Sequence, residues 1–538
     1  MGQPEPLSVD DALDRLVNQF SDSMAFFREL IQNALDAGSE EVEIDFAYED
    51  GKLVIHVDDW GAGMNREIID TRLTRLFSSS KDGDRTKIGK FGIGFVSVFA
   101  IDPDAVCIDT SRDGEHWRIV FDDKRKFSLI RRDQPTEGTK IRIFKTMSRG
   151  EFQAFTVRAA EVVRYWCKHV AGEIRVAGEL VNEDFDLDAP VKVRRQQDEE
   201  LVVIGHRVDG HSFAGFYNRG LTLTEQELIP GVAFKASSAN LEHTLTRDDV
   251  IREAGFERLM ARVHGLIADE LCTAVFTALD EAARALDPSS PPSGEARDRI
   301  AYLWRCALWH EQAEHDLPER AAVQQAAIFR SPAGRLLTLS ELRKGRGKGF
   351  IVAARSSPLT EILERAGQLV LWLPADFSSG RALATALSRD RVQEVERWCT
   401  ALPPRDSREA VRWQVLANHV ARLLDDWGAK LAGVRLGHLD YPDSSVRERV
   451  IITQSEFGEA TQVEQAGELG TSLLSSRRTV VLNADHPTVR TIAALAQSEP
   501  ELAAYFAVKA FFLGSRLDAA TDEALAGLTF DARLKRTG

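Results

Sequence analysis

The sequence has few cysteines, and their spacing fits neither a disulfide framework nor a metal site. Its 538 residues include five cysteines, at positions 107, 167, 272, 306 and 399, and none of them forms a C-x-x-C pair. Because they are odd in number and widely scattered, we expect buried free thiols.

Long apolar runs and an excess of basic residues are also absent. No stretch approaches the roughly 20 apolar residues of a membrane span, and the first residues, MGQPEP, do not begin like a signal peptide. The formal net charge is -15, which argues against general nucleic-acid binding but leaves room for a local basic patch. We therefore expect a cytoplasmic protein with no membrane partner, for which nucleic acid is a disfavoured partner.

The composition is that of a soluble globular protein, with 43% hydrophobic and 28% charged residues. A chain of this length exceeds what a single hydrophobic core can support. It predicts roughly three to four domains.

The stretch 26–37 reads as an amphipathic helix. Its apolar residues recur at helical spacing and should face a core. Glu29, Asn33 and Asp36 stand at i, i+4 and i+7, so they share one face. Taken alone, this face is most simply a solvated polar stripe of a surface helix.

Two predicted strands, 42–47 and 53–57, lead into a D-x-G-x-G turn that begins at Asp59. A carboxylate there can accept a hydrogen bond from an exocyclic amine, and the glycines let the backbone approach a flat ring closely. Met64 can pack its thioether on an aromatic face. An acidic tight turn without a ligand is an equally good interpretation of this segment alone.

A glycine-rich stretch, 87–95, precedes an apolar helix and can form an anion cradle from backbone N–H groups. It is neither a P-loop nor a dinucleotide fingerprint. Further strands are expected at 105–109, 117–121 and 127–130, and another opens with Gly138-Thr139. Helices are expected at 152–170, 254–286, 296–315 and 319–329.

Four blocks occur in one order: R-E-L-I-x-N-A-x-D-A at 28–37, D-x-G-x-G-M at 59–64, G-K-F-G-I-G-F at 89–95 and G-T-K-I at 138–141. Together they resemble the GHKL ATPases, which include gyrase, histidine kinases and MutL, and most closely the 90-kDa heat-shock chaperones, called HtpG in bacteria. The resemblance implies an α+β chain. It would have a GHKL (Bergerat) ATP-binding sandwich in 1–183, an α/β middle domain in 184–398 and a mostly helical dimerisation domain in 399–538.

The resemblance also implies roles for individual residues. Glu29 would be the general base that polarises water, and Asn33 would complete the shell of Mg²⁺. Asp59 would bind the adenine amine, with Thr139 helping through water and Met64 packing on the ring. The remaining implied contacts with ATP are Gly63, Gly89, Phe91, Gly92, Ile93, Gly94 and Phe95. These roles suit phosphoryl transfer, which needs a metal, a positioned water and phosphate donors.

The segment 231–249 resembles a middle-domain segment of the chaperones, and this implies that Arg247 reaches the γ-phosphate as an arginine finger. A surface arginine paired with Asp248 or Asp249 is the alternative. Two features depart from the family. Ile251 stands where a glutamine is expected, and only 24 residues separate Met64 from Gly89, fewer than expected of the ATP lid.

The phrase L-N-x-x-H-P-x-V at 482–489 resembles the C-terminal domain of the chaperones. Helices are expected at 488–497 and 501–513. The second is dense in large apolar residues, and with little chain left to cover it we favour a homodimer seam over a core.

The sequence thus predicts an ATP-dependent chaperone, a homodimeric clamp that acts on unfolded or partly folded clients with ATP and Mg²⁺. The alternative is an ATP-gated interaction module for a dedicated partner, such as a defence or DNA-associated complex, because GHKL folds serve several functions. A kinase or topoisomerase relative is disfavoured, since no phosphoacceptor-histidine domain is recognised and the chain is acidic.

Overall fold

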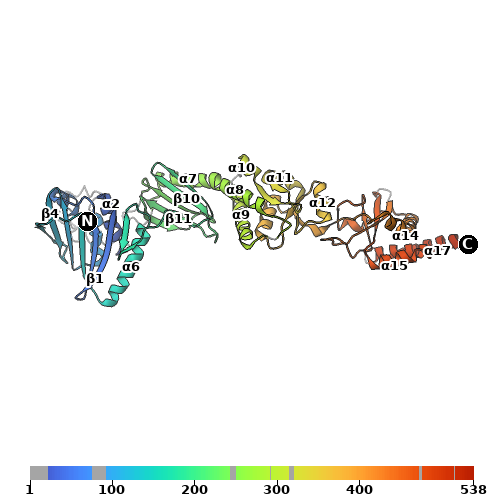
Figure 1. The fold of residues 1–538 in the computed structure, drawn as a ribbon, viewed down its shortest axis with the longest axis horizontal. Coiled ribbons are helices and arrows are strands. Elements are labelled where there is room, and N and C mark those ends of the chain that lie inside the picture. Colours follow the sequence, from blue (N-terminus) through green and yellow to red (C-terminus); the bar gives the residue numbers. More distant parts are fainter. Residues whose placement is uncertain are drawn as a thin grey trace, which may run out of the picture. The chain divides into compact units, whose positions relative to one another are not determined.

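The computed structural model describes residues 22–74, 93–242, 250–290, 292–313, 320–471, 475–513, 515 and 517–537. The chain forms two compact units, 1–271 and 272–538 (Figure 1). Each is an α+β structure, so the predicted fold class is confirmed. The domain boundaries predicted after residues 183 and 398 stay predictions.

The first unit begins with a mixed sheet of eight strands in the order β5-β4-β3-β6-β2-β1-β7-β8. Every neighbouring pair is antiparallel except β1 and β7, which run parallel. The strands are β1 (Glu41–Glu49), β2 (Lys52–Asp59), β3 (Ala105–Arg112), β4 (Glu115–Phe121), β5 (Phe127–Arg131), β6 (Thr139–Thr146), β7 (Glu173–Val176) and β8 (Glu179–Leu180).

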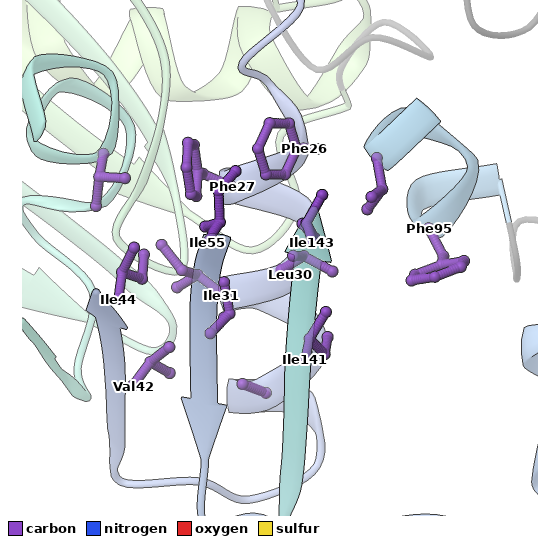
Figure 2. Close-up of a cluster of buried hydrophobic side chains, with 14 of the residues drawn as sticks. Phe26, Phe27, Leu30, Ile31, Val42, Ile44, Ile55, Phe95, Ile141 and Ile143 are labelled. Carbon is purple, nitrogen blue, oxygen red and sulfur yellow. The ribbon is translucent and has the colours of Figure 1, made fainter. Parts of the chain in front are cut away.

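Helices α2 (Phe26–Asp36) and α6 (Arg149–Cys167) pack against each other and against this sheet. Phe27 and Ile31 of α2 are fully buried, as the helical spacing predicts. Figure 2 shows the side chains of α2 meeting alternate side chains of β1, β2 and β6. Full burial of one such side chain contributes about 1.5–3 kcal/mol, so the polar face of α2 is held in place by the apolar one.

Short helical segments complete this part of the chain. They are α3 (Arg66–Ile68), the π-helical turn η1 (Ile69–Leu73), α5 (Ile93–Val96) and the 3-10 turn η2 (Ser97–Ile101). Both α5 and η2 contact α2, so the end of the glycine-rich stretch lies against the helix that carries Glu29.

A second, five-stranded sheet follows in the order β12-β11-β13-β10-β9. It consists of β9 (Val191–Gln197), β10 (Glu200–His206), β11 (Phe213–Asn218), β12 (Leu221–Gln226) and β13 (Ala233–Ser238). The sheet is followed in the chain by α7 (Ala254–Leu266) and the π-helical turn η3 (Ile267–Leu271). The end of α6 is bonded to this sheet, because Thr222 Oγ1 donates to the Tyr165 carbonyl at 2.6 Å. Lys168 Nζ also lies 2.7 Å from Glu225 Oε1.

The second unit starts with α8 (Cys272–Ala285), α9 (Gly294–Gln312), α10 (Ala321–Gln325) and the hairpin β14 (Ala327–Arg330) with β15 (Leu336–Thr338). The helix predicted over 319–329 is therefore wrong in its second half. The tertiary partners explain the strand: the Ala327 N–H donates to Asp280 Oδ1 at 2.7 Å, and Phe329 is buried with its ring 5.6 Å from that of Trp304.

A small parallel sheet in the order β17-β16-β18 comes next. Its strands are β16 (Phe350–Ala353), β17 (Leu369–Trp372) and β18 (Val392–Glu394). The same part of the chain forms the helices α11 (Leu339–Gly345), α12 (Pro358–Arg365) and α13 (Ser378–Ser388) and the 3-10 turns η4 (Arg346–Lys348) and η5 (Val395–Arg397). These elements lie within 184–398, the range in which the sequence predicts an α/β domain.

The last part combines four helices with short strands. The helices are α14 (Ser407–Asp426), α15 (Pro487–Leu495), α16 (Pro500–Phe512) and α17 (Ala519–Thr537), and the strands are β19 (Trp398–Cys399), β20 (Leu431–Gly437), β21 (Ile451–Gln454), β22 (Thr461–Gln462) and β23 (Arg478–Asn483), with the 3-10 turn η6 (Gln465–Gly467). Among the described residues, no helix combines the length and the apolar character needed to cross a bilayer.

Helix α17 covers part of α16, contrary to the expectation that little chain remained for this. Arg533 Nη2 lies 2.8 Å from Glu499 Oε1, and Arg536 Nε lies 2.8 Å from Glu501 Oε1. The apolar residues of 501–513 consequently divide. Phe512 belongs to the core, whereas Phe506 remains 43% exposed.

Candidate functional site

Asp59 ends β2 beside Thr139, the first residue of β6, with which it is in register. Its side chain is buried, and Oδ1 accepts hydrogen bonds from the Gly61 N–H at 2.9 Å and the Thr139 N–H at 3.1 Å. Burial raises the pKa of Asp59, although both bonds oppose the shift. Among the described residues Oδ2 has no hydrogen-bond donor, so this oxygen can accept from a ligand.

The turn after Asp59 is held by Thr110 of β3. Thr110 Oγ1 accepts from the Met64 N–H at 2.8 Å and lies 3.2 Å from Thr139 Oγ1. Gly63 has φ +61°, and a Cβ there would overlap the Ser111 carbonyl, so glycine is required at this position. Met64 is half-buried at the edge of the core.

Asp58 faces the other side of the sheet, as strand alternation requires. It pairs with Arg142, and its Oδ2 lies 3.4 Å from Lys140 Nζ. The two acids therefore have different partners, and Asp59 is the one that lies beside Thr139.

Glu29 is buried on α2 and lies against two other groups. Arg28 Nη2 donates to its Oε1 at 3.4 Å, and a Cβ built on Gly94 would lie 2.6 Å from its Oε2. The Arg28 guanidinium is itself buried, 4.5 Å from the ring centre of Trp166 on α6. A glycine at position 94 thus allows the glycine-rich stretch to approach the carboxylate.

Asn33 lies one turn after Glu29 on α2, and both Asn33 and Asp36 are exposed. The polar face of this helix is therefore buried at Glu29 and exposed to solvent at Asn33 and Asp36. No group of three His, Cys, Asp or Glu side chains within the described ranges could hold a metal ion. An amide oxygen beside a carboxylate still suits Mg²⁺, which takes few protein ligands and shares substrate phosphates.

The remaining predicted site residues are only partly placed. Ile93 begins α5, and the Phe95 ring is buried beside those of Phe99 and Phe121, with centroids 6.1 and 5.5 Å away. Phe95 can thus contribute to a ligand site through its backbone only. Four predicted residues lie outside the described ranges: Gly89, Phe91, Gly92 and Arg247. Their roles stay predictions.

The sequence interpretation missed two residues of this site. Thr110 lies one residue beyond the strand predicted over 105–109, and only its register with Thr139 shows that it supports the turn. Arg28 reads as an ordinary helix residue until Trp166, 138 positions later, is found over it. Neither contact is encoded locally.

Residues 24–137 match the family model described as "Histidine kinase-, DNA gyrase B-, and HSP90-like ATPase". This region is a GHKL ATPase domain. The matched range contains Glu29, Asn33, Asp59 and Gly94, and it ends one residue before the glycine of the Gly138-Thr139 strand opening.

About a third of the chain also resembles curated chaperones. The "Chaperone protein HtpG" of Bordetella avium is 29% identical over 212 residues, which are 34% of this chain and 32% of that protein. The HtpG of Rhodospirillum rubrum is 30% identical over 205 residues, 32% of each chain. That of Roseobacter denitrificans is 26% identical over 213 residues, 34% of each chain. The similarity supports an HSP90-like relation, and it spans about a third of each relative.

Proposed function

We propose that this protein is an ATPase that uses its nucleotide cycle as a molecular chaperone of the 90-kDa heat-shock type. The observation that supports the nucleotide site most strongly is the environment of Asp59. This carboxylate is buried at the end of β2, its Oδ1 is occupied by two backbone N–H groups, and its Oδ2 is available.

In this proposal Asp59 Oδ2 accepts the adenine amine, and Met64 packs on the ring. Thr139 supports the same edge through its hydroxyl, which Thr110 holds at 3.2 Å. Because both N–H bonds fix the Asp59 carboxylate before any ligand arrives, binding costs little reorganisation.

For hydrolysis we assign Glu29 as the base that takes a proton from the attacking water, with Oε2 toward Gly94. Arg28 Nη2 lies 3.4 Å from Oε1 and holds that oxygen in place. When Mg²⁺ is bound it supplies charge neutralisation at the phosphates, and the Asn33 amide oxygen is the protein group that would hold it. Arg247 remains the candidate arginine finger.

The test of this assignment is Glu29→Ala in the full chain. We expect ATP binding to be retained and the turnover rate to fall about 10²–10⁴-fold, the usual contribution of a general base. Asp36→Ala, an exposed acid seven residues further along α2, is the matched control and should hydrolyse ATP at the parent rate. Parent-like hydrolysis by Glu29→Ala would refute the base assignment.

The chaperone role and its partners are proposed from the HtpG similarity and from the C-terminal helices. Five apolar side chains there remain 43–72% exposed in the single chain: Val411, Phe506, Leu513, Phe530 and Leu534. We propose a homodimer through this region that holds unfolded or partly folded clients. The test is suppression of aggregation of unrelated unfolded proteins, which should depend on ATP and be lost in Asp59→Asn.

An ATP-gated interaction module for one dedicated partner, in a defence or DNA-associated complex, is the second candidate. Two features of the chain favour it: only 24 residues lie between Met64 and Gly89, and Ile251 replaces the expected glutamine. Tight binding to one cellular protein, with no effect on any unfolded client, would support this candidate against the chaperone.

A further inference from the structure

A group of exposed cations lies where α11 and η4 meet the start of β18. We call it the basic cluster, and its members are Lys344, Arg346, Lys348, Arg389 and Arg391. Four of the five are exposed and Arg346 is half-buried. The segment 342–349 reads L-R-K-G-R-G-K-G and contains no acidic residue.

The fold brings the two halves of the cluster together. Arg391 Nη1 donates to the Gly347 carbonyl at 2.9 Å, and the Phe350 N–H donates to the Arg391 carbonyl at 2.8 Å. Phe350 is in register with Val392 in the parallel pair of β16 and β18. Both α11 and η4 also contact α13, the helix that ends beside Arg389.

These cations are not neutralised within the described part of the chain. No carboxylate lies within 4.0 Å of any of the five, whereas the neighbouring Arg343 lies 3.7 Å from Glu311 and Arg381 lies 2.6 Å from Glu394. Asp390 lies between Arg389 and Arg391 in the sequence.

Helix ends account for three of the five members. Lys344 lies in the last turn of α11, Arg346 is the C-cap residue of α11 and Arg389 is that of α13, and a cation at these places interacts favourably with the helix dipole. Lys348 and Arg391 lie outside both helices. Like charges gathered without partners repel one another, so an external anion is the natural counterpart of this surface.

The surroundings of the cluster favour phosphates over a protein partner. Among the described residues between 320 and 405, no large apolar side chain is prominently exposed. Protein interfaces usually have aromatic or aliphatic anchors at their centre. Backbone phosphates need only cations and N–H donors.

We propose that the basic cluster binds the phosphate backbone of a nucleic acid without reading its base sequence. This goes beyond the proposed ATPase and does not depend on it. The net charge of -15 predicts that the rest of the chain repels nucleic acid, so contact is confined to this surface and weakens steeply with salt.

The test measures fluorescence anisotropy of a short labelled DNA duplex of mixed sequence, titrated with the full chain at several salt concentrations. We expect binding at low salt, with log K falling against log salt at a slope of roughly −3 to −4.5, about 0.9 for each phosphate contacted. Lys344→Glu combined with Lys348→Glu should weaken binding at least about tenfold at low salt.

The matched control is Arg365→Glu combined with Arg477→Glu. Both are exposed cations of the same unit outside the cluster, and Arg365, like Lys344, is near a helix end. The two double variants change the net charge of the protein by the same amount. Gly347→Glu is a second probe, because a Cβ there meets nothing within 4 Å. It should weaken binding while leaving the circular dichroism spectrum unchanged.

Three results would overturn the proposal. They are no DNA binding by the parent at the lowest salt, equal weakening in the control pair, and binding to vesicles of anionic lipid with none to DNA. ATP hydrolysis measured on the same samples should be unchanged in every variant, which separates this proposal from the ATPase assignment.

Discussion

Gly94 lies against the carboxylate of Glu29, so closely that a Cβ at position 94 would be 2.6 Å from Oε2. The end of the glycine-rich stretch and the proposed base therefore share one small volume. Because Glu29 is buried, its carboxylate has little space in which to avoid an added methyl group.

Gly94→Ala should displace Glu29 and impair hydrolysis more than ATP affinity. We expect the turnover rate to fall at least about tenfold, since misplacing a catalytic group by an ångström has effects of this order or larger. The measurement is steady-state phosphate release together with ATP titration. Gly150→Ala, where a Cβ meets nothing within 4 Å, should behave as the parent. Unchanged turnover in Gly94→Ala would show that this contact does not position the base.

Asp59→Asn should abolish ATP binding without destabilising the protein. Burial raises the pKa of Asp59 above 3.8, so the ionised carboxylate costs stability at neutral pH, and this cost disappears as the pH falls through the raised pKa toward 3.8. An amide removes the cost and still accepts the two N–H bonds at Oδ1. The unfolding temperature without nucleotide should equal or exceed that of the parent.

The control for this prediction is Asp58→Asn, which loses surface ion pairs with Arg142 and Lys140. It should retain ATP binding by calorimetry. If Asp58→Asn lost binding and Asp59→Asn kept it, the assignment of the adenine-binding acid would have to be exchanged.

His438 should make the second unit less stable as the pH rises above 6.5. Burial opposes its protonation, but bonds to Glu409 Oε2 at 3.0 Å and Asp485 Oδ1 at 2.7 Å outweigh this and raise the pKa of His438 above 6.5. The stabilisation is complete below pH 6.5 and is lost as the pH rises through the folded-state pKa.

Thermal unfolding of the full chain at several pH values checks this expectation. In the parent, the unfolding temperature should be higher at pH 6 than at a pH above the raised pKa of His438. His438→Gln should remove this difference. His486→Asn keeps an N-cap acceptor for α15 and should still show the difference. If the pH dependence of stability persisted in His438→Gln, another titrating group would have to be its cause.

Phe530→Asp combined with Leu534→Asp should convert the proposed homodimer into a monomer. These side chains are 62% and 68% exposed on α17 in the single chain, and a buried unpaired carboxylate at an interface is costly. Sedimentation equilibrium gives the molecular mass. Val157→Asp, at an equally exposed position on α6, should leave the mass unchanged, and a monomeric parent would disprove the dimer.

Local sequence patterns predicted the elements that depend on neighbours along the chain. The apolar spacing of α2 and the D-x-G-x-G turn are of this kind, and both lie where the sequence placed them. Contacts between distant segments were not predictable in this way. Thr110 supports the Met64 turn through a hydrogen bond across 46 positions, and no residue near Thr110 indicates it.

The error at 319–329 has the same origin. The run A-A-V-Q-Q-A-A favours a helix by intrinsic propensity, and α10 does begin there. Pairing with β15 and the bond from Ala327 to Asp280 then extend the chain as a strand. Tertiary partners that lie far away in the sequence overrule the local preference.

The buried position of Arg28 under Trp166 connects the proposed base to the five-stranded sheet. Trp166 belongs to the last turn of α6, and the carbonyl of its neighbour Tyr165 accepts the hydrogen bond from Thr222 on β12. This hydrogen bond and the ion pair between Lys168 and Glu225 join β12 to the end of α6, and the Trp166 ring of α6 lies against the cation beside Glu29. We therefore expect the ATPase rate to report mechanical load on the second sheet, even when the nucleotide pocket itself is untouched.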